Sequence, residues 1–295
     1  MSAPSVSACP FRLAPLLLLL IPLLFVSPAR SGTQDDADLL KRGIDALPAL
    51  LASVDSPDPD RRLRSRRLAT RIVLAHHRAR APAGMEFVYG PVRVDPRGVH
   101  LKGAFYLASR EVTRGQFAAF AAATGLKRGR WADGDDAHPV VWISYEEAGA
   151  YAKWKKARLP SLDELSNAAT SFGRLRFPWG GRFDARFLNS KEGARGSEQS
   201  PGSFARGRSP AGIHDLLGNV SEWTTTTTGK SKRLRIFGGS FKDLLGRRSA
   251  PFVVNRMAAT ARSADVGFRL ALALPQIAPR PPQAPAGVPG ASGSR

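Results

Sequence analysis

The sequence predicts a mixed α+β fold with little regular secondary structure, preceded by a short helical segment. Three observations support this fold class. Strand-like and helix-like segments alternate over residues 84–274, separated by many glycines and prolines. Three helix-start signatures lie in the first half of this range. In the second half, helical spacing gives way to short extended runs.

Residues 1–31 have the composition of a secretory signal peptide. A short polar start with Arg12 precedes an apolar run over residues 13–26, and Ala29 and Ser31 are the small residues that signal peptidase prefers. The run is shorter than the roughly 20 apolar residues of a spanning helix, and two prolines interrupt it. We therefore expect cleavage and a secreted or periplasmic protein. A retained membrane anchor is the weaker alternative.

The chain is strongly basic. It has 44 basic and 24 acidic residues and a formal net charge of +20; loss of Arg12 and Arg30 with the signal leaves +18, which is 42 minus 24. Such a charge favours polyanionic partners. Because export makes nucleic acid the least expected of these, we expect an anionic glycan, a peptide or an envelope protein. Solubility alone is the alternative explanation of the charge.

Cysteine usage limits the chemistry. The one cysteine, Cys9, lies ahead of the apolar run and leaves with the signal peptide. The cleaved chain then has no thiol and no disulfide, so an ordinary hydrophobic core must hold the fold.

Residues 32–83 are expected to form a helical, basic segment. Helical spacing covers residues 36–54 and 60–80, and a Ser-Pro-Asp-Pro turn at residues 56–59 separates them. The second helix carries eight arginines: Arg61, Arg62, Arg64, Arg66, Arg67, Arg71, Arg78 and Arg80. We expect its apolar side to pack on the main domain. Contact with a membrane surface is the alternative for so basic a helix.

Each of the three helix-start signatures pairs a hydroxyl residue with Glu or Gln three positions later. Reciprocal hydrogen bonds between such residues satisfy amides that the first helical turn leaves unpaired. The pairs are Thr113 with Gln116, Ser144 with Glu147, and Ser161 with Glu164. Apolar residues at helical spacing follow every pair, so the sequence predicts three short helices.

Extended runs and a low-complexity tail follow these helices. The runs cover residues 223–228, 233–237 and 266–272, and the first includes five consecutive threonines, whose β-branched side chains favour strands. Residues 275–295 are rich in Pro, Ala, Gly and Ser and are predicted to be disordered.

Short blocks stand in a fixed order along residues 84–274. They include residues 85–88 (Met-Glu-Phe-Val), 111–117, 139–148, 158–161, 177–180 (Phe-Pro-Trp-Gly), 218–223 (Gly-Asn-Val-Ser-Glu-Trp), 237–241 (Phe-Gly-Gly-Ser-Phe) and 266–269 (Val-Gly-Phe-Arg). In this order they resemble the formylglycine-generating enzyme (sulfatase-modifying factor) family. One block would be weak, but the ordered set is specific. The resemblance implies a C-type-lectin-like domain over residues 84–274.

The chemistry of that family is missing at two positions. In its oxidases, two cysteines after the Gly-Gly-Ser block bind copper and activate oxygen to convert a substrate cysteine into formylglycine. At the family's spacing the matching residues are Asp243 and Arg248. Copper(I) requires soft thiolate ligands, which neither side chain supplies. We therefore expect no copper and no catalytic residue here.

The resemblance also implies a structural calcium site. The family binds calcium around its Gly-Asn-x-x-Glu-Trp block, and the matching positions are Asp215, Gly218, Val220 and Glu222. Two carboxylates with interleaved backbone carbonyls suit a hard cation that takes roughly six to eight oxygen ligands. The alternative is that Asp215 and Asn219 only cap local turns.

Four arginines lie between the Gly-Gly-Ser block and the closing Gly-Phe-Arg block. They are Arg247, Arg248, Arg256 and Arg262. In the family's oxidases this segment lines the active-site groove, so we expect the four side chains to share one face. They are candidates to bind sulfate, phosphate or carboxylate by forked hydrogen bonds. A solvated face is the alternative.

Together these features favour an exported pseudoenzyme that acts as a binding module for an anionic ligand or partner protein. A formylglycine-generating oxidase acting on sulfatase cysteines is the catalytic alternative, and the lack of thiols disfavours it. A structural envelope component that docks through the basic helix is a third hypothesis.

Overall fold

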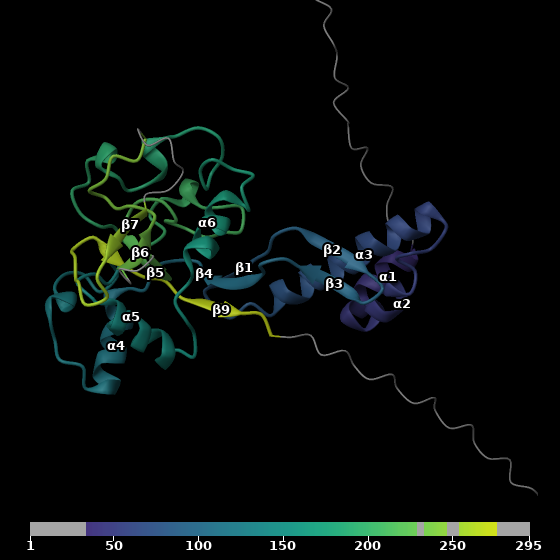
Figure 1. Ribbon diagram of the computed structural model, residues 1–295, viewed down its shortest axis with the longest axis horizontal. Coiled ribbons are helices and arrows are strands. Elements are labelled where there is room, and N and C mark those ends of the chain that lie inside the picture. The colour runs from purple at the N-terminus through teal and green to yellow at the C-terminus, as the bar shows by residue number, and fades with distance from the viewer. Residues whose placement is uncertain (1–33, 229–232, 247–253, 276–295) are drawn as a thin grey trace, which may run out of the picture.

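The computed structural model describes residues 34–228, 233–246 and 254–275, and it confirms a mixed α+β fold with few helices and small sheets. The predicted signal peptide, with Cys9, and the tail from residue 276 onward lie outside these ranges. Figure 1 shows an elongated chain, with a helical lobe at one end and the main domain at the other. No helix in the described ranges is long and apolar enough to cross a membrane.

The helical lobe is built on α3 (Pro59–Ala79). Asp58 caps this helix by accepting hydrogen bonds from the amides of Asp60 (3.0 Å) and Arg61 (3.4 Å). The proline at the first helical position loses no hydrogen bond, because that amide would be unpaired in any case. The predicted turn and second helix are therefore present.

The first expected helix, over residues 36–54, is broken into shorter pieces. These are α1 (Gln34–Arg42), a 3-10 turn (Gly43–Ala46) and α2 (Leu47–Leu51). Gly43 has a positive φ of 58°, which ends α1, and Pro48 lies in the first turn of α2. The break lets α1 and α2 both pack their apolar sides against α3.

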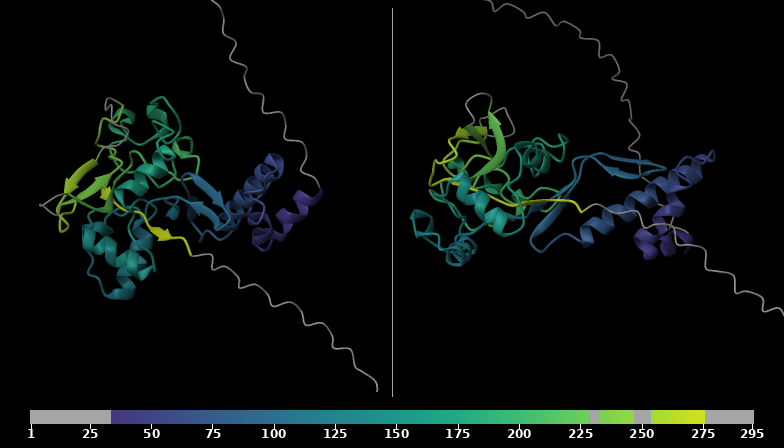
Figure 2. Two further views of the ribbon diagram at one scale, coloured as in Figure 1. Left: turned by 45° about the vertical axis from the view of Figure 1, so that its right-hand side comes forward. Right: turned by 60° about the horizontal axis from the view of Figure 1, so that its bottom comes forward.

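The apolar side of α3 is buried inside this lobe. Leu68, Ala69 and Ile72 pack with Leu50 of α2 and with Val94 of a β-hairpin that the sequence did not predict. The hairpin consists of β2 (Val92–Asp95) and β3 (Gly98–Leu101), and it lies alongside α3 (Figure 2). The face of α3 that remains in solvent carries its arginines.

Two small sheets form the main domain. An antiparallel sheet has the order β1 (Met85–Val88), β4 (Phe105–Ala108) and β9 (Ala271–Ala273). A second sheet has the order β7 (Val254–Met257), β6 (Arg233–Phe237), β5 (Ser221–Thr228) and β8 (Val266–Gly267), with β8 parallel to β5. The expected runs at 223–228 and 233–237 are thus confirmed as strands.

The expected run over residues 266–272 is not one strand. It divides into β8 and β9, which belong to different sheets. Phe268 and Arg269 lie between them, and both side chains are fully buried. The chain leaves the four-stranded sheet after β8 and joins the three-stranded sheet at β9.

The three predicted capping boxes all form, and each begins a helix. The helices are α4 (Arg114–Thr124), α5 (Tyr145–Trp154) and α6 (Leu162–Thr170). At α6, for example, the Glu164 amide donates to Ser161 Oγ (3.1 Å) and the Ser161 amide donates to Glu164 Oε2 (2.8 Å). These local contacts explain why the helix starts could be read from the sequence.

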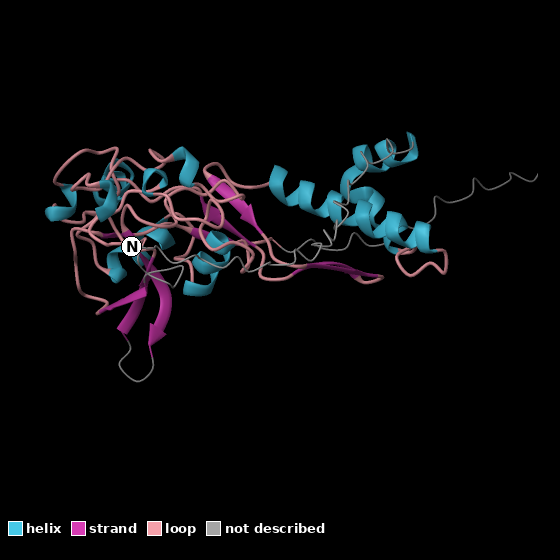
Figure 3. Ribbon diagram, turned by 90° about the horizontal axis from the view of Figure 1, so that it is seen from above, coloured by secondary structure: helices cyan, strands magenta, loops and turns pink. Residues whose placement is uncertain are grey.

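Strand β6 contributes side chains to two hydrophobic clusters. Phe117 of α4 and Tyr151 of α5 pack with Trp223 and Phe268 in one cluster. Leu165 of α6 and Leu107 of β4 pack with Phe237 in the other. Most of the remaining chain is loop, with short 3-10 turns, as Figure 3 shows. This arrangement places residues 219–222 and 267–269 at the centre of the domain.

Candidate functional site

A fully buried ion pair lies at the centre of the main domain. The parallel pairing of Glu222 with Gly267 brings Arg269 beside the Glu222 carboxylate. Arg269 Nε lies 2.9 Å from Oε1 and 2.7 Å from Oε2 of Glu222, and Nη2 lies 2.6 Å from Oε1. The two side chains are 0% and 2% exposed. Such a fork is the strongest geometry available to an arginine and a carboxylate.

Arg269 also holds two backbone segments. Its Nη1 donates to the Ala108 carbonyl (3.1 Å) at the end of β4, and its Nη2 donates to the His214 carbonyl (2.9 Å). Burial by itself lowers the pKa of Arg269, but the charge and hydrogen bonds of Glu222, together with the charges of Glu111 and Asp215, outweigh burial and the pKa is raised. Arg269 is therefore charged, and its nitrogen donors point at protein oxygens.

Asn219 forms a second crosslink a few residues earlier. It adopts a left-handed conformation with a φ of 59°. Its Nδ2 donates to Glu111 Oε1 (2.9 Å) and to the Gln199 carbonyl (3.1 Å), while its Oδ1 accepts from Asn189 Nδ2 (3.0 Å) and the Gln199 amide (2.9 Å). Asn219 thus joins distant segments rather than only capping its own turn.

Two further acids lie in this interior. Asp215 accepts a hydrogen bond from the Gly202 amide (2.6 Å), and burial raises its pKa. Burial, and then the charge of Asp215, raise the pKa of Glu111 well above its usual range. Within the described chain, Glu111 Oε2 has no hydrogen-bond partner. Three buried carboxyl groups thus lie near one buried arginine, Arg269, which forms an ion pair with Glu222 and acts on Glu111 and Asp215 through its charge.

The predicted calcium ligands have other partners in this arrangement. Both Glu222 oxygens accept from Arg269, whose positive charge would oppose a cation at the same carboxylate. Val220 is fully buried in the core. In the described part of the chain, no group of three or more His, Cys, Asp or Glu side chains could hold a metal ion. The Glu222 carboxylate is thus already paired with an arginine, and the calcium site stays a sequence-based prediction.

Asp243, at one of the two family cysteine positions, holds a turn together. Its Oδ2 accepts from the Ser240 amide (2.9 Å) and lies 3.1 Å from Ser240 Oγ, and its own amide donates to the Ser240 carbonyl (3.0 Å). Its carbonyl accepts from the Lys191 amide (3.0 Å). The carboxylate therefore has a structural role. The other position, Arg248, lies outside the described residues.

The four arginines proposed from the sequence do not form one described group. Arg247 and Arg248 lie outside the described residues. Arg262 points to α5, where its Nη2 lies 2.8 Å from Glu147 Oε1. Arg256 lies on β7 and is exposed. The two described members therefore have different neighbours.

Arg256 instead belongs to a cluster on the sheet, which we call the sheet arginines: Arg233, Arg235 and Arg256. Arg256 is directly opposite Arg235 in the β6–β7 register, so both side chains lie on one face. The buried Leu234 and Ile236 point the other way. Within the described ranges, none of the three guanidinium groups has an ion-pair partner. Strand alternation was the signal that could have identified Arg233 and Arg235.

Comparison with known proteins places these features in context. The family model of the sulfatase-modifying factor enzyme 1-like domain matches residues 78–274. The chain is 35% identical over 152 residues to a protein of Mus musculus named inactive C-alpha-formylglycine-generating enzyme 2, which covers 45% of this chain and 48% of that protein. It is 37% identical over 103 residues to the formylglycine-generating enzyme of Mycobacterium tuberculosis, covering 30% and 33% of the two chains.

The solved structure of PvdO from Pseudomonas aeruginosa matches with a TM-score of 0.50 and 22% identity, over 65% of this chain and 92% of that one. At this identity the likeness concerns the fold alone, and it confirms the C-type-lectin-like fold that the sequence blocks imply. The chain spans about half or less of the length of the two curated relatives named above.

The buried Glu111 gives stability a defined pH dependence. Because its folded-state pKa is raised above the ordinary 4.5, its stabilising contribution is complete below that value and is lost as the pH rises toward the raised pKa. The loss is about 1.4 kcal/mol per pH unit in this window. Glu111→Gln keeps the acceptor for Asn219 and removes the titration. We expect it to be more stable than wild type near neutral pH and similar to it at about pH 4.

Urea unfolding at a series of pH values measures this difference. Asp133→Asn, which removes an exposed acid, is the matched control and should leave the profile unchanged. A constant difference between wild type and Glu111→Gln at every pH would contradict the assignment.

Calcium and the Arg269 pair give opposite expectations for thermal unfolding. An ion bound only by the folded chain would stabilise it by about 2.7 kcal/mol at 100 times its Kd. Because Arg269 already neutralises Glu222, we expect equal melting temperatures in calcium and in chelator. A calcium-dependent rise that Asp215→Asn removes would instead establish the predicted site.

Proposed function

This chain belongs to the family of the sulfatase-modifying factor enzyme 1-like domain, and we propose that it is a non-catalytic member that binds an anionic ligand or partner protein. The lack of a thiol carries the first half of this proposal. The one cysteine, Cys9, precedes the matched residues 78–274. Copper(I) chemistry requires thiolates, and no other side chain replaces them well.

The neighbourhood of Asp243 supports the same conclusion. Its carboxylate accepts from Ser240 and closes the turn after the Gly-Gly-Ser block. A side chain used in this way is not available as a soft metal ligand. The relative from Mus musculus is named an inactive enzyme, which shows that the family includes proteins described as non-catalytic.

The sheet arginines support the second half of the proposal. Like charges directly opposite each other on adjacent strands destabilise a sheet, and Arg235 faces Arg256 in this way. A bound sulfate, phosphate or carboxylate would offset their repulsion through forked hydrogen bonds. The signal-like residues 1–31 lead us to propose that this binding occurs outside the cytoplasm.

A sulfatase-derived cysteine peptide tests the non-catalytic assignment. We expect the full chain, with copper and oxygen, to leave the peptide mass unchanged, because no thiolate holds the metal. Mass spectrometry measures the mass, and a copper-loaded formylglycine-generating enzyme is the positive control. Conversion of the cysteine to the lighter aldehyde by this chain would refute the assignment.

Calorimetric titration with a sulfated disaccharide tests the sheet arginines. Arg235→Gln/Arg256→Gln should weaken binding by about tenfold, since two charge contacts together are worth roughly 1.4 kcal/mol. The matched control is Arg61→Gln/Arg97→Gln, which removes the same charge from exposed positions in the helical lobe. Equal losses in the two double variants would mean that net charge alone attracts the ligand, and the assignment to the sheet would fail.

A further inference from the structure

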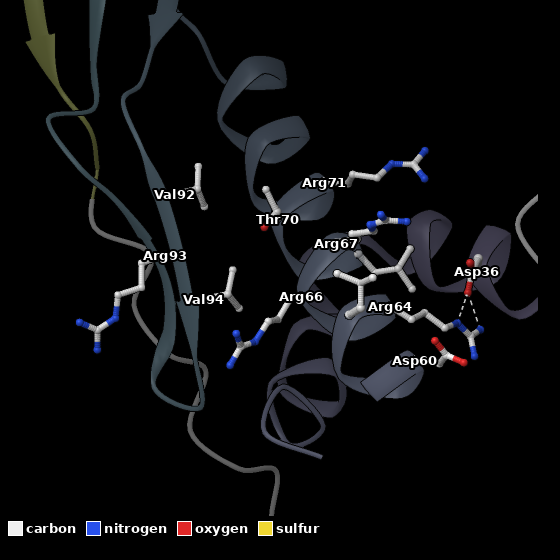
Figure 4. Close-up of a pocket in the computed structure, with 12 residues that line it drawn as sticks. Asp36, Asp60, Arg64, Arg66, Arg67, Thr70, Arg71, Val92, Arg93 and Val94 are labelled. Atoms are coloured by element: carbon white, nitrogen blue, oxygen red, sulfur yellow. Dashed lines mark hydrogen bonds and ion pairs between the residues drawn. The ribbon is translucent and has the colours of Figure 1, made fainter. Parts of the chain in front are cut away.

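The exposed face of α3 carries a row of arginines, which we call the α3 row: Arg64, Arg67, Arg71 and Arg78. They stand at positions i, i+3, i+7 and i+14, so they lie on one side of the helix. In Figure 4, Arg64, Arg67 and Arg71 project from the same side of α3. At 1.5 Å per residue, the row extends over about 21 Å.

A groove with a volume of about 950 Å³ runs along the first part of this row. Asp36 of α1 borders it on one side, and Val92 and Val94 of β2 border it on the other (Figure 4). The groove joins the N-terminal helices, which precede the family-matched residues, to a hairpin inside them. It is therefore a different surface from the sheet arginines.

The charges of this groove are only partly compensated. Arg64 Nε donates to Asp36 Oδ1 (2.6 Å), and Asp60 lies at the same end. Further along, Arg67 and Arg71 have no ion-pair or hydrogen-bond partner among the described side chains, and both are exposed. Like charges four positions apart destabilise a helix. An anionic ligand along the row would remove this cost.

The last arginine of the row, Arg78, is held by an aromatic side chain. Arg78 lies over the ring of Tyr89, with its central carbon 5.9 Å from the ring centre. This contact restricts the motion of the Arg78 guanidinium, so less side-chain entropy is lost when a ligand binds there. The positive charges thus continue for two turns beyond Arg71, which suits a long ligand better than a single compact anion.

We propose that the α3 row binds a linear polyanionic glycan, one that carries sulfate or carboxylate groups along its length. The structure favours a glycan over a membrane, because Leu68, Ile72 and Val73, which would insert into lipid, are buried in the lobe. Leu63 is the one large apolar side chain of this helix that is exposed, at 50%.

Single-stranded nucleic acid is also disfavoured. Proteins that bind it combine a basic groove with aromatic side chains on which the bases stack. The described residues that line the groove include no aromatic ring, and the Tyr89 ring at the end of the row lies against Arg78. A row of arginines with no aromatic rings in its groove suits a glycan chain better than stacked bases. Recognition of such a glycan depends on the spacing of its anionic groups.

Calorimetric titration of the full chain with a heparin dodecasaccharide tests the proposal. We expect Arg67→Gln/Arg71→Gln to weaken binding about tenfold and the control Arg61→Gln/Arg97→Gln to change it less than about twofold. A heparin disaccharide should bind this row more weakly than the dodecasaccharide, because it reaches fewer arginines. An oligogalacturonate of equal length distinguishes carboxylate from sulfate recognition, and binding of either chain through Arg67 and Arg71 supports the proposal.

Four results would overturn it. The first is an equal loss of affinity in Arg67→Gln/Arg71→Gln and in Arg61→Gln/Arg97→Gln, and the second is equal affinity of the α3 row for the short and long heparin fragments. The third and fourth are binding of single-stranded DNA, or of phosphatidylglycerol vesicles, through Arg67 and Arg71 that is tighter than binding of the dodecasaccharide. Arg235→Gln/Arg256→Gln, the variant of the sheet arginines, should leave dodecasaccharide binding at the α3 row intact. Dodecasaccharide binding by this variant therefore reports on the α3 row independently of the sheet arginines. Thermal melts of all variants show whether each one is folded.

Discussion

The buried pair of Arg269 and Glu222 is the contact on which the main domain depends. Through it β5, the chain after β8, the end of β4 and the loop at His214 are fixed to one another. A buried charge left without its partner costs roughly 3–5 kcal/mol, so neither residue can change alone. Because Arg269 already occupies both Glu222 oxygens, a calcium ion at this carboxylate would have to compete with it.

Acidic and basic groups are distributed differently in this chain. Glu111, Asp215 and Glu222 are buried around one arginine, whereas the α3 row and the sheet arginines are exposed, apart from the partly buried Arg235, and have few acidic neighbours. Repulsion within each basic cluster works against folding. Arg67, Arg71 and the sheet arginines have no acidic partner among the described residues, which is why we propose an external anionic ligand for each cluster. The net charge of +20 therefore reflects local surfaces as well as solubility.

The main domain has the fold of its family, but Asp243, which the order of the sequence blocks matches to a family cysteine, has a structural role. Asp243 fixes the turn that follows the Gly-Gly-Ser block, and Asn219 joins the loops at Asn189, Gln199 and Glu111 behind it. A loop-rich fold held by such crosslinks can present new surfaces without new secondary structure. This separation of fold from chemistry is why membership of the family does not establish its activity here.

The sequence by itself determined the features that depend on near neighbours. Each capping box joins residues three apart, so the starts of α4, α5 and α6 could be predicted. The strands at residues 223–228 and 233–237 followed from β-branched composition and the position of the runs. The absence of cysteine from residues 78–274 and the order of the family blocks also needed no structure.

Tertiary structure decided which distant residues meet. Arg269 and Glu222 are 47 positions apart, and their pairing depends on the parallel alignment of β8 with β5. The expected run at 266–272 forms two strands in different sheets, and the side chains of Phe268 and Arg269 between them are buried in the interior. Strand register likewise placed Arg256 opposite Arg235, while Arg262 turned to Glu147. Local hydrogen bonds are set by neighbouring residues, but partners across a fold are set by the path of the whole chain.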